Sequence, residues 1–227
     1  MASCVRCLAK GNPSSLFQIR VLASVAGHHA ESCRAALKLG RYCSGCVCLS
    51  GLSLEQVDIL WHCLVEDAEC YDDALHWFLN QVRSKDQHAM GMETYKHLFL
   101  EKMPQLKPET ISMTGLNLFQ HLCNLARLAT STLDNASSCE LCGMDQLWGI
   151  ALRAQSADIS RAAIQYINSY YINAGKTGLE KEQEFIRKCI ESLLMASANL
   201  EKEAHSSLTS TERGLLMLKT HLEAFRR

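Results

Sequence analysis

The sequence carries almost no net charge and no long apolar run, and both absences limit what the protein can be. Lys and Arg number 23 against 24 Asp and Glu, so the formal net charge is −1. A chain this close to neutral has no broad electrostatic field that would attract nucleic acid or an anionic membrane surface. The most apolar early stretch, LFQIRVLASVAG, is interrupted by Gln18 and Arg20, whereas a membrane span needs roughly 18 to 20 apolar residues. We expect neither a nucleic-acid partner nor a membrane partner.

No signal peptide is visible in the sequence either, which changes how the twelve cysteines are interpreted. In a small secreted domain they would indicate disulfides, but 227 residues with 48% hydrophobic content can bury a core without them. Reduced thiols are therefore expected. The predicted location is the cytoplasm, with the nucleus as a second compartment.

Strand-like alternation is almost absent, whereas helical periodicity covers most of the chain. In YDDALHWFLNQV, apolar residues recur at helical spacing and form one stripe: Tyr71, Ala74, Leu75, Phe78, Leu79 and Val82. Two further stripes have the same spacing, one with Ile159, Ala162, Ala163, Tyr166, Ile167 and Tyr170, the other with Ile186, Cys189, Ile190, Leu193 and Leu194. Capping boxes are predicted at Ser53–Gln56 and Thr209–Glu212, and Pro104 and Pro108 interrupt the middle. The predicted fold is all-α, with about ten helices.

A weak internal repeat refines this prediction. ILWHCLVEDAECYDDALHWFL resembles QLWGIALRAQSADISRAAIQYI, and Trp61 and Trp148 lie 87 positions apart. That separation is about two periods of roughly 40 to 47 residues, which are typical of HEAT and armadillo arrays. Small residues such as Ala162 and Ala163 would let helices approach while the tryptophans fill the space between layers. We predict an irregular armadillo/HEAT-like α-solenoid over residues 52–227, with an irregular helical bundle as the alternative. Residues 1–51 are predicted to form divergent N-terminal helices and a Cys-rich loop.

Three Cys-x-x-Cys pairs raise the question of zinc: Cys4/Cys7, Cys43/Cys46 and Cys139/Cys142. A structural zinc site needs four ligands around one ion, usually from two facing pairs. CSGCVC supplies one pair, but the next cysteines, Cys63 and Cys70, fall in helical patterns, where they would be about 10 Å apart. We therefore assign no metal-ligating residue and no cofactor, and a small zinc-binding interaction module remains an alternative.

Two other motifs fail on chemistry. NAGKTG, residues 173–178, ends like a phosphate-binding loop, but Tyr170 stands where the first glycine is needed and no strand precedes it. His28 and His29 near Cys33 could suggest a thiol catalyst, yet no oxyanion hole or orienting group has a signature here. No catalytic residue is assigned.

Three segments carry a resemblance to a known family: QVDILWHCLVEDAECYDDALHWF, DQLWGIALRAQSADISRAAIQYINSYYINAGKTGLEKEQEFI and ERGLLMLKTHLEAFRR. From about Leu52 onward, the chain resembles the large helical region of the giant ubiquitin-specific proteases. In that family the helical array precedes a ubiquitin-like module and a papain-like catalytic domain, and neither is recognisable here. The family's nucleophile lies in an Asn-x-Gly-x-Thr-Cys box, and this chain has no Thr-Cys dipeptide. Its Gly-His-Tyr box also differs from the sequence at Gly27–His29.

The resemblance implies a non-catalytic scaffold segment of a deubiquitinase, acting in ubiquitin-dependent protein turnover through protein–protein interactions. Its partners would be ubiquitinated substrates or adaptors. A solenoid suits this role because each repeat contacts only its neighbours and leaves a long surface free. The alternative is that the parent's cysteine-type deubiquitinase activity describes the chain.

Overall fold

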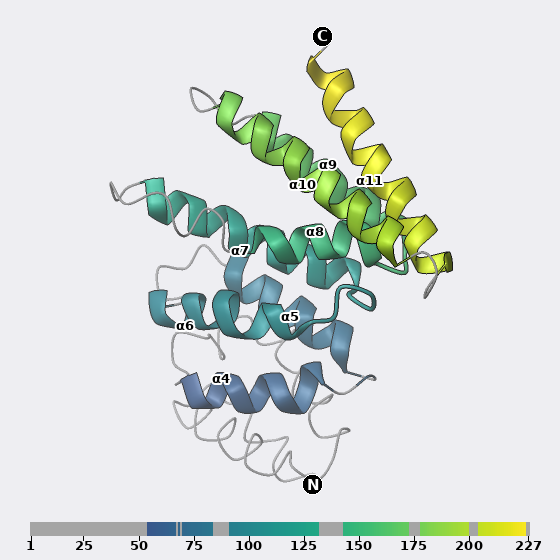
Figure 1. Ribbon diagram of the computed structural model, residues 1–227. Coiled ribbons are helices and arrows are strands. Elements are labelled where there is room, and N and C mark those ends of the chain that lie inside the picture. Colours follow the sequence, from purple (N-terminus) through teal and green to yellow (C-terminus); the bar gives the residue numbers. More distant parts are fainter. Residues whose placement is uncertain are drawn as a thin grey trace, which may run out of the picture. The chain divides into compact units, whose positions relative to one another are not determined.

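The computed structural model describes residues 54–66, 68, 70–83, 91–131, 143–172, 178–199 and 204–225 (Figure 1). Within these ranges the regular structure is entirely helical, with eight α-helices and no strand. The all-α prediction is confirmed. None of the described helices combines the length and apolarity that crossing a bilayer requires.

The chain divides into two compact units. One combines the residues up to Met103 with Asn117–Leu125, and the other combines Pro104–Leu116 with the residues from Ala126 onward. The predicted boundary between residues 1–51 and 52–227 falls outside the described residues, so it stays a prediction.

In the first unit, α4 (Leu54–Leu60) runs directly into a π-helical turn, η3 (Trp61–Val65), and α5 (Tyr71–Arg83) follows. The stripe predicted on α5 is confirmed, because its four central members, Ala74, Leu75, Phe78 and Leu79, are buried. Trp61 lies against this stripe, with its ring centroid 5.3 Å from that of Phe78. The first Leu-Trp pair of the weak repeat therefore supplies a core residue.

The same unit continues through α6 (Met92–His97) and a second π-helical turn, η4 (Leu98–Lys102). A 3₁₀ turn, η5 (Met103–Gln105), then ends the run at the predicted break. Pro104 lacks an amide hydrogen and so cannot continue the α-helical ladder. Part of α7 (Met113–Ser131) completes this core, since Phe119 lies 5.8 Å from Phe99 and the Tyr95 hydroxyl donates to the Leu122 carbonyl.

The second unit contains two pairs of helices that are consecutive in the chain. The first pair is α8 (Met144–Arg153) and α9 (Ala157–Ile172), and the second is α10 (Gly178–Ala198) and α11 (Ala204–Phe225). Gly143 precedes α8 with φ 90°, a left-handed conformation that glycine adopts without steric cost. Ser156 accepts a hydrogen bond from the Ile159 amide at 3.5 Å and so caps α9. The buried Ser160 hydroxyl donates to the Ala151 carbonyl at 2.5 Å, which joins α9 to α8.

Two sequence expectations about this unit need correction. The buried face of α9 includes Ile159, Ala163 and Ile167 as predicted, but Ala162 is only half-buried. The face is turned by one position, so that it also contains Ser160, Ile164, Asn168 and Tyr171. The predicted and observed faces differ because Ser160 and Asn168 are buried in this unit, whereas a hydrophobic pattern leaves polar residues out.

The capping box predicted at Thr209–Glu212 is wrong, because α11 begins at Ala204. Thr209 lies inside the helix, and its hydroxyl donates to the His205 carbonyl one turn earlier at 3.0 Å. Ser and Thr satisfy their hydroxyls in this way within helices, so the same residue types fit a cap and a helix interior. The other predicted box has Ser53 as its N-cap, and α4 begins at the next residue, Leu54. Ser53 itself lies outside the described residues, so this box stays a prediction.

Candidate interaction surface

A cluster of aromatic rings holds the α10–α11 pair against α8 and α9. Phe185 of α10 lies at its centre, with ring centroids 5.6 Å from Trp148, 5.1 Å from Tyr171 and 4.1 Å from the stacked ring of His221. These four side chains come from four helices, and all are buried. Such aromatic contacts fix the relative position of the helices because the rings are large and rigid.

Polar contacts fix the same arrangement at both ends of α8. The guanidinium of Arg213 on α11 donates to the carbonyls of Leu152, at 3.0 Å, and Ala154, at 2.6 Å. These carbonyls lie at the C-terminal end of α8, where they have no partner inside the helix. Near the start of α8, Asp145 pairs with Lys188 of α10 at 2.8 Å. The inner side of the α10–α11 pair is therefore determined by specific contacts.

The outer side of the pair exposes a second set of apolar side chains, which we name the outer seam. On α10, Ile190 is 49% exposed and Leu194 is 65% exposed. On α11, Leu208, Leu215 and Leu222 are 59%, 53% and 49% exposed. This corrects the prediction that Ile186–Leu194 forms a single stripe, because Cys189 is fully buried whereas Ile190 and Leu194 face solvent. The apolar arc of α10 is wide enough to contain two faces.

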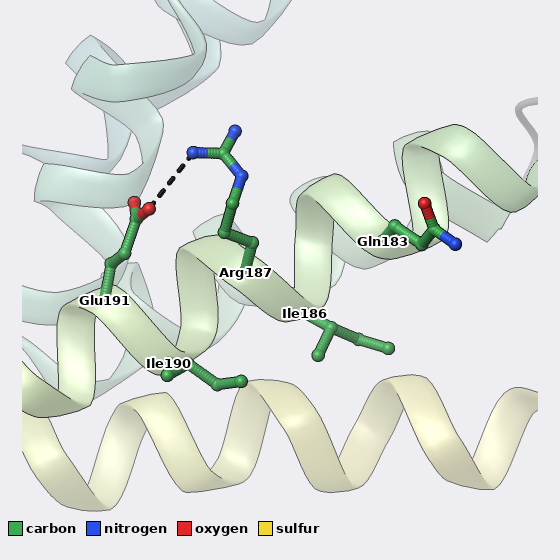
Figure 2. Close-up of a pocket in the computed structure, with 5 residues that line it drawn as sticks. All are labelled: Gln183, Ile186, Arg187, Ile190 and Glu191. Carbon is green, nitrogen blue, oxygen red and sulfur yellow. Dashed lines mark hydrogen bonds and ion pairs between the residues drawn. The ribbon is translucent and has the colours of Figure 1, made fainter.

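A shallow groove runs along the α10 part of the outer seam (Figure 2). Ile186 and Ile190 extend toward the side of α11, whereas Arg187 and Glu191 stand on the opposite side and pair with each other at 3.0 Å. Gln183 completes the lining. The groove has a volume of about 290 Å³, at the lower limit of the roughly 300–1,000 Å³ of small-molecule sites. Its shape suits side chains of another protein better than a metabolite.

A second surface feature combines cations with tyrosine rings. The Arg127 guanidinium lies 5.4 Å from the ring centroid of Tyr170 and 5.9 Å from that of Tyr166. The Lys181 ammonium lies 4.9 Å from the Tyr170 ring and donates to its hydroxyl at 3.3 Å. These contacts order two cations on aromatic faces near the start of α10.

In the first unit, Asp58 joins α4 to the α6–η4 segment. Its carboxylate accepts from His97 Nε2 at 2.5 Å and Lys102 Nζ at 2.6 Å, and the other ring nitrogen of His97 lies 3.2 Å from Glu101. Desolvation alone would raise the pKa of Asp58, but the hydrogen bonds from Lys102 and His97 lower it below its ordinary value. This network of ion pairs links α4 to the α6–η4 segment through Asp58 and His97, which are 39 positions apart in the sequence.

The same network resembles the histidine–carboxylate part of a thiol catalyst, which also needs a reachable thiolate. Among the described cysteines, Cys70, Cys123 and Cys189 form no disulfide and are buried. Burial raises the pKa of the Cys189 thiol to about 12, so this thiol is neutral at physiological pH. Within the described ranges, no group of three His, Cys, Asp or Glu side chains has an arrangement that could hold a metal ion.

Several residues weighed in the sequence lie outside the described residues: Cys4, Cys7, His28, His29, Cys33, Cys43, Cys46, Cys48, Cys139 and Cys142. The NAGKTG loop also falls there, except that its last residue begins α10 at Gly178. The sequence interpretation missed the outer seam, although the seven-residue spacing of Leu208, Leu215 and Leu222 was a visible signal. It also missed the Asp58–His97 network, since no local pattern links residues so far apart.

Comparison with known proteins finds long relatives. Over 176 residues the chain is 88% identical to ubiquitin carboxyl-terminal hydrolase 34 of both Mus musculus and Homo sapiens, covering 78% of this chain and 5% of each relative. Ubiquitin carboxyl-terminal hydrolase puf of Drosophila melanogaster is 48% identical over 182 residues, again 78% of this chain and 5% of the relative. No protein-family model and no solved structure matches the chain.

Ubiquitin carboxyl-terminal hydrolase 24 of Homo sapiens is 31% identical over 156 residues, which cover 62% of this chain and 6% of the relative. The three quoted segments by themselves predict hydrolase 24 as the most similar member. The much higher identity to hydrolase 34 corrects that prediction, whereas the resemblance to the giant ubiquitin-specific proteases is confirmed. The chain spans only a small part of the length of these relatives. The chain is therefore similar to one segment of large ubiquitin carboxyl-terminal hydrolases.

Proposed function

We propose that the chain is a non-catalytic scaffold segment of a ubiquitin-specific protease and that it acts by binding proteins. The observation that carries this proposal is the outer seam, because exposed contiguous apolar surface is typical of protein interaction sites. The buried, neutral thiol of Cys189 supports it, since a deubiquitinase of the thiol class needs a reactive cysteine. Ubiquitinated substrates or adaptors of the parent protease are the proposed partners, in the cytoplasm and the nucleus.

The proposed architecture is an armadillo/HEAT-like array of helical repeats. The two successive helix pairs of the second unit support it, as does the burial of both Trp61 and Trp148 in equivalent positions of the weak sequence repeat. In such an array each pair contacts its neighbours, so a segment can hold binding sites in a fixed order. Catalysis would then belong to another part of the parent protein.

An electrophilic ubiquitin probe, which forms a covalent bond with the thiolate of an active deubiquitinase, tests this proposal. The isolated chain should form no adduct, and full-length human hydrolase 34 provides the positive control. Deleting the matched segment from the full-length protein should leave probe labelling intact but change the set of proteins identified by proximity labelling and mass spectrometry. A specific adduct on this chain, or loss of labelling after the deletion, would contradict a non-catalytic role. An unchanged set of neighbouring proteins would contradict a role in binding.

A further inference from the structure

Each helix of the α10–α11 pair has two apolar faces, whereas a surface helix needs only one. On α10 the inner face carries Phe185 and Cys189, which are buried, and the outer face carries Ile190 and Leu194. On α11 the leucines of the outer seam recur every seven residues, which places them on one side of the helix over four turns. The inner faces pack against α8 and α9. The outer faces have no such cover within the described part of the chain.

The two outer faces lie next to each other along the line where α10 meets α11. Gly214 marks a point where α11 approaches its neighbours closely. A Cβ placed there would lie 3.2 Å from Cδ2 of Leu193 on α10 and 4.0 Å from Cδ2 of Leu152 on α8. Gly214 thus faces both α10 and α8, and Leu215, one position on, is turned away from α8. Figure 2 shows Ile186 and Ile190 extending from α10 on the same side as α11. The apolar residues of the two helices therefore form one seam, and the shallow groove lies on its α10 side.

Two ion pairs border the outer seam, each within one helix. Arg187 pairs with Glu191 on α10, and Lys219 pairs with Glu223 on α11 at 3.8 Å. Exposed Glu212 adds a negative charge near Leu208 and Leu215, so the border has no excess positive charge that would attract an anionic membrane or a nucleic acid. An exposed apolar surface of this kind instead fits the apolar stripe of another helix, whose side-chain ridges would enter the groove.

The molecule itself contains an example of such an occupant. The α10–α11 pair covers α8 and α9 with rings and aliphatic side chains, and a few polar contacts orient it. The matched segment is only 5% of the length of the mouse and human relatives, so most of their chain lies outside it and can supply further helices. A second helix pair stacked on the outer seam would repeat the arrangement already present on the inner side.

We infer that the outer seam is the binding site for an amphipathic helix pair from the same protease polypeptide. The helix that contacts the seam would present apolar residues at positions i, i+3 or i+4, and i+7. This inference rests on the proposed scaffold function and names the partner of one of its faces. The seam would then be a protein-binding surface, as proposed above, whose partner in the parent protein is part of the same polypeptide.

Hydrogen–deuterium exchange on full-length human hydrolase 34 and on this chain tests the inference. Peptides from residues 204–225 should exchange at least about tenfold more slowly in the full-length protein than in this chain, because docking suppresses local opening. Replacing the residue aligned with Leu215 by Asp should restore fast exchange in the full-length protein. The matched control is Leu100→Asp, which changes another exposed leucine, 48% exposed, and should leave exchange in α11 unchanged. Because both leucines are exposed, both variants should fold, and circular dichroism checks this.

Photo-cross-linking of the full-length protein, from a photoreactive residue placed at the position aligned with Lys219, identifies what covers the seam. Cross-links to helices elsewhere in the same polypeptide support the inference. Equal exchange rates in the two proteins, or cross-links to other proteins only, would overturn it. Dimers of this chain that dissociate in Leu215→Asp would also overturn it, because the occupant would then be a second copy. None of these results depends on ubiquitin-probe labelling or on the proximity-labelling pattern, so the scaffold proposal stands or falls separately.

Discussion

Trp148 illustrates what a single residue reveals before and after its surroundings are known. The Leu-Trp repeat predicts a tryptophan that fills space between helices, and the structure buries it to 5% exposure. Its aromatic partner, Phe185, lies on α10, and no local pattern links the two residues. Residue type and spacing thus indicate that Trp148 is in the core, but only packing shows which helix it contacts.

Trp148→Ala should lower the free energy of unfolding by about 3 to 5 kcal/mol, because it removes a buried indole and leaves a cavity beside Phe185. Urea unfolding followed by circular dichroism at 222 nm measures the change. Lys219→Ala is the control, since Lys219 is exposed and should cost less than about 0.5 kcal/mol. Equal effects of the two substitutions would mean that the indole does not support the α8–α10 contact.

His221 should make stability depend on pH. Burial lowers the pKa of this imidazole below its ordinary value of 6.5, and the charge of Glu182 offsets this only in part. The unfolded chain therefore takes up a proton near pH 6.5 while the folded chain does not until lower pH. The stabilisation is complete above pH 6.5 and is lost as the pH falls through the folded pKa.

His221→Phe keeps a ring stacked on Phe185 but removes the titration. The free energy of unfolding should then fall less steeply, as the pH drops below 6.5, than it does in the unmodified chain. Urea titrations at several pH values measure this slope. An unchanged slope would show that other groups account for the pH dependence in this range.

Individual helices follow from the sequence to different degrees. On α5 the apolar stripe is narrow and matches the buried residues, so its inward face could be predicted. On α10 the apolar residues cover a wide arc, and periodicity alone cannot divide the arc into an inner and an outer face. The start of α11 was misplaced for a related reason, because Thr209 and Glu212 match a capping pattern inside the helix.

Gly214 tests the close contact among α11, α10 and α8. Gly214→Val should destabilise the chain by about 1 to 3 kcal/mol, because its branched side chain would overpack against Leu193. Gly214→Ala should be milder, since Ala gains about 1 kcal/mol of helix propensity over Gly and the Leu193 side chain can shift slightly. Thermal unfolding ranks the two variants, and a Val variant as stable as the Ala variant would contradict the close approach.

At the scale of the molecule, the sequence predicts the structural class and the resemblance well but long-range contacts poorly. The absence of strand alternation predicts an all-α fold, which the described residues confirm, and the three scaffold segments predict the resemblance to ubiquitin-specific proteases, which the relatives confirm. Contacts such as Asp58 with His97, or Arg213 with the end of α8, depend on how distant helices meet. Hydrophobic periodicity does not predict which distant helices contact each other.

The three Cys-x-x-Cys pairs give a prediction for the full 227-residue chain. Purified under reducing conditions, it should contain no stoichiometric zinc, and its helical circular dichroism should survive a strong chelator. The reason is that no two of the pairs have the compact spacing of known zinc modules. Metal analysis near one zinc per chain, together with unfolding by the chelator, would instead establish a structural metal.

The exposed leucines of α11 also bear on the fate of the protein in a cell. Whenever the outer seam is uncovered, a row of apolar side chains resembles the surface that chaperones bind in incompletely folded proteins. A form of the protease that lacks the covering helices would therefore be retained by chaperones and removed faster than the intact protein. The same leucines that extend the array would then act as a quality-control signal for its completeness.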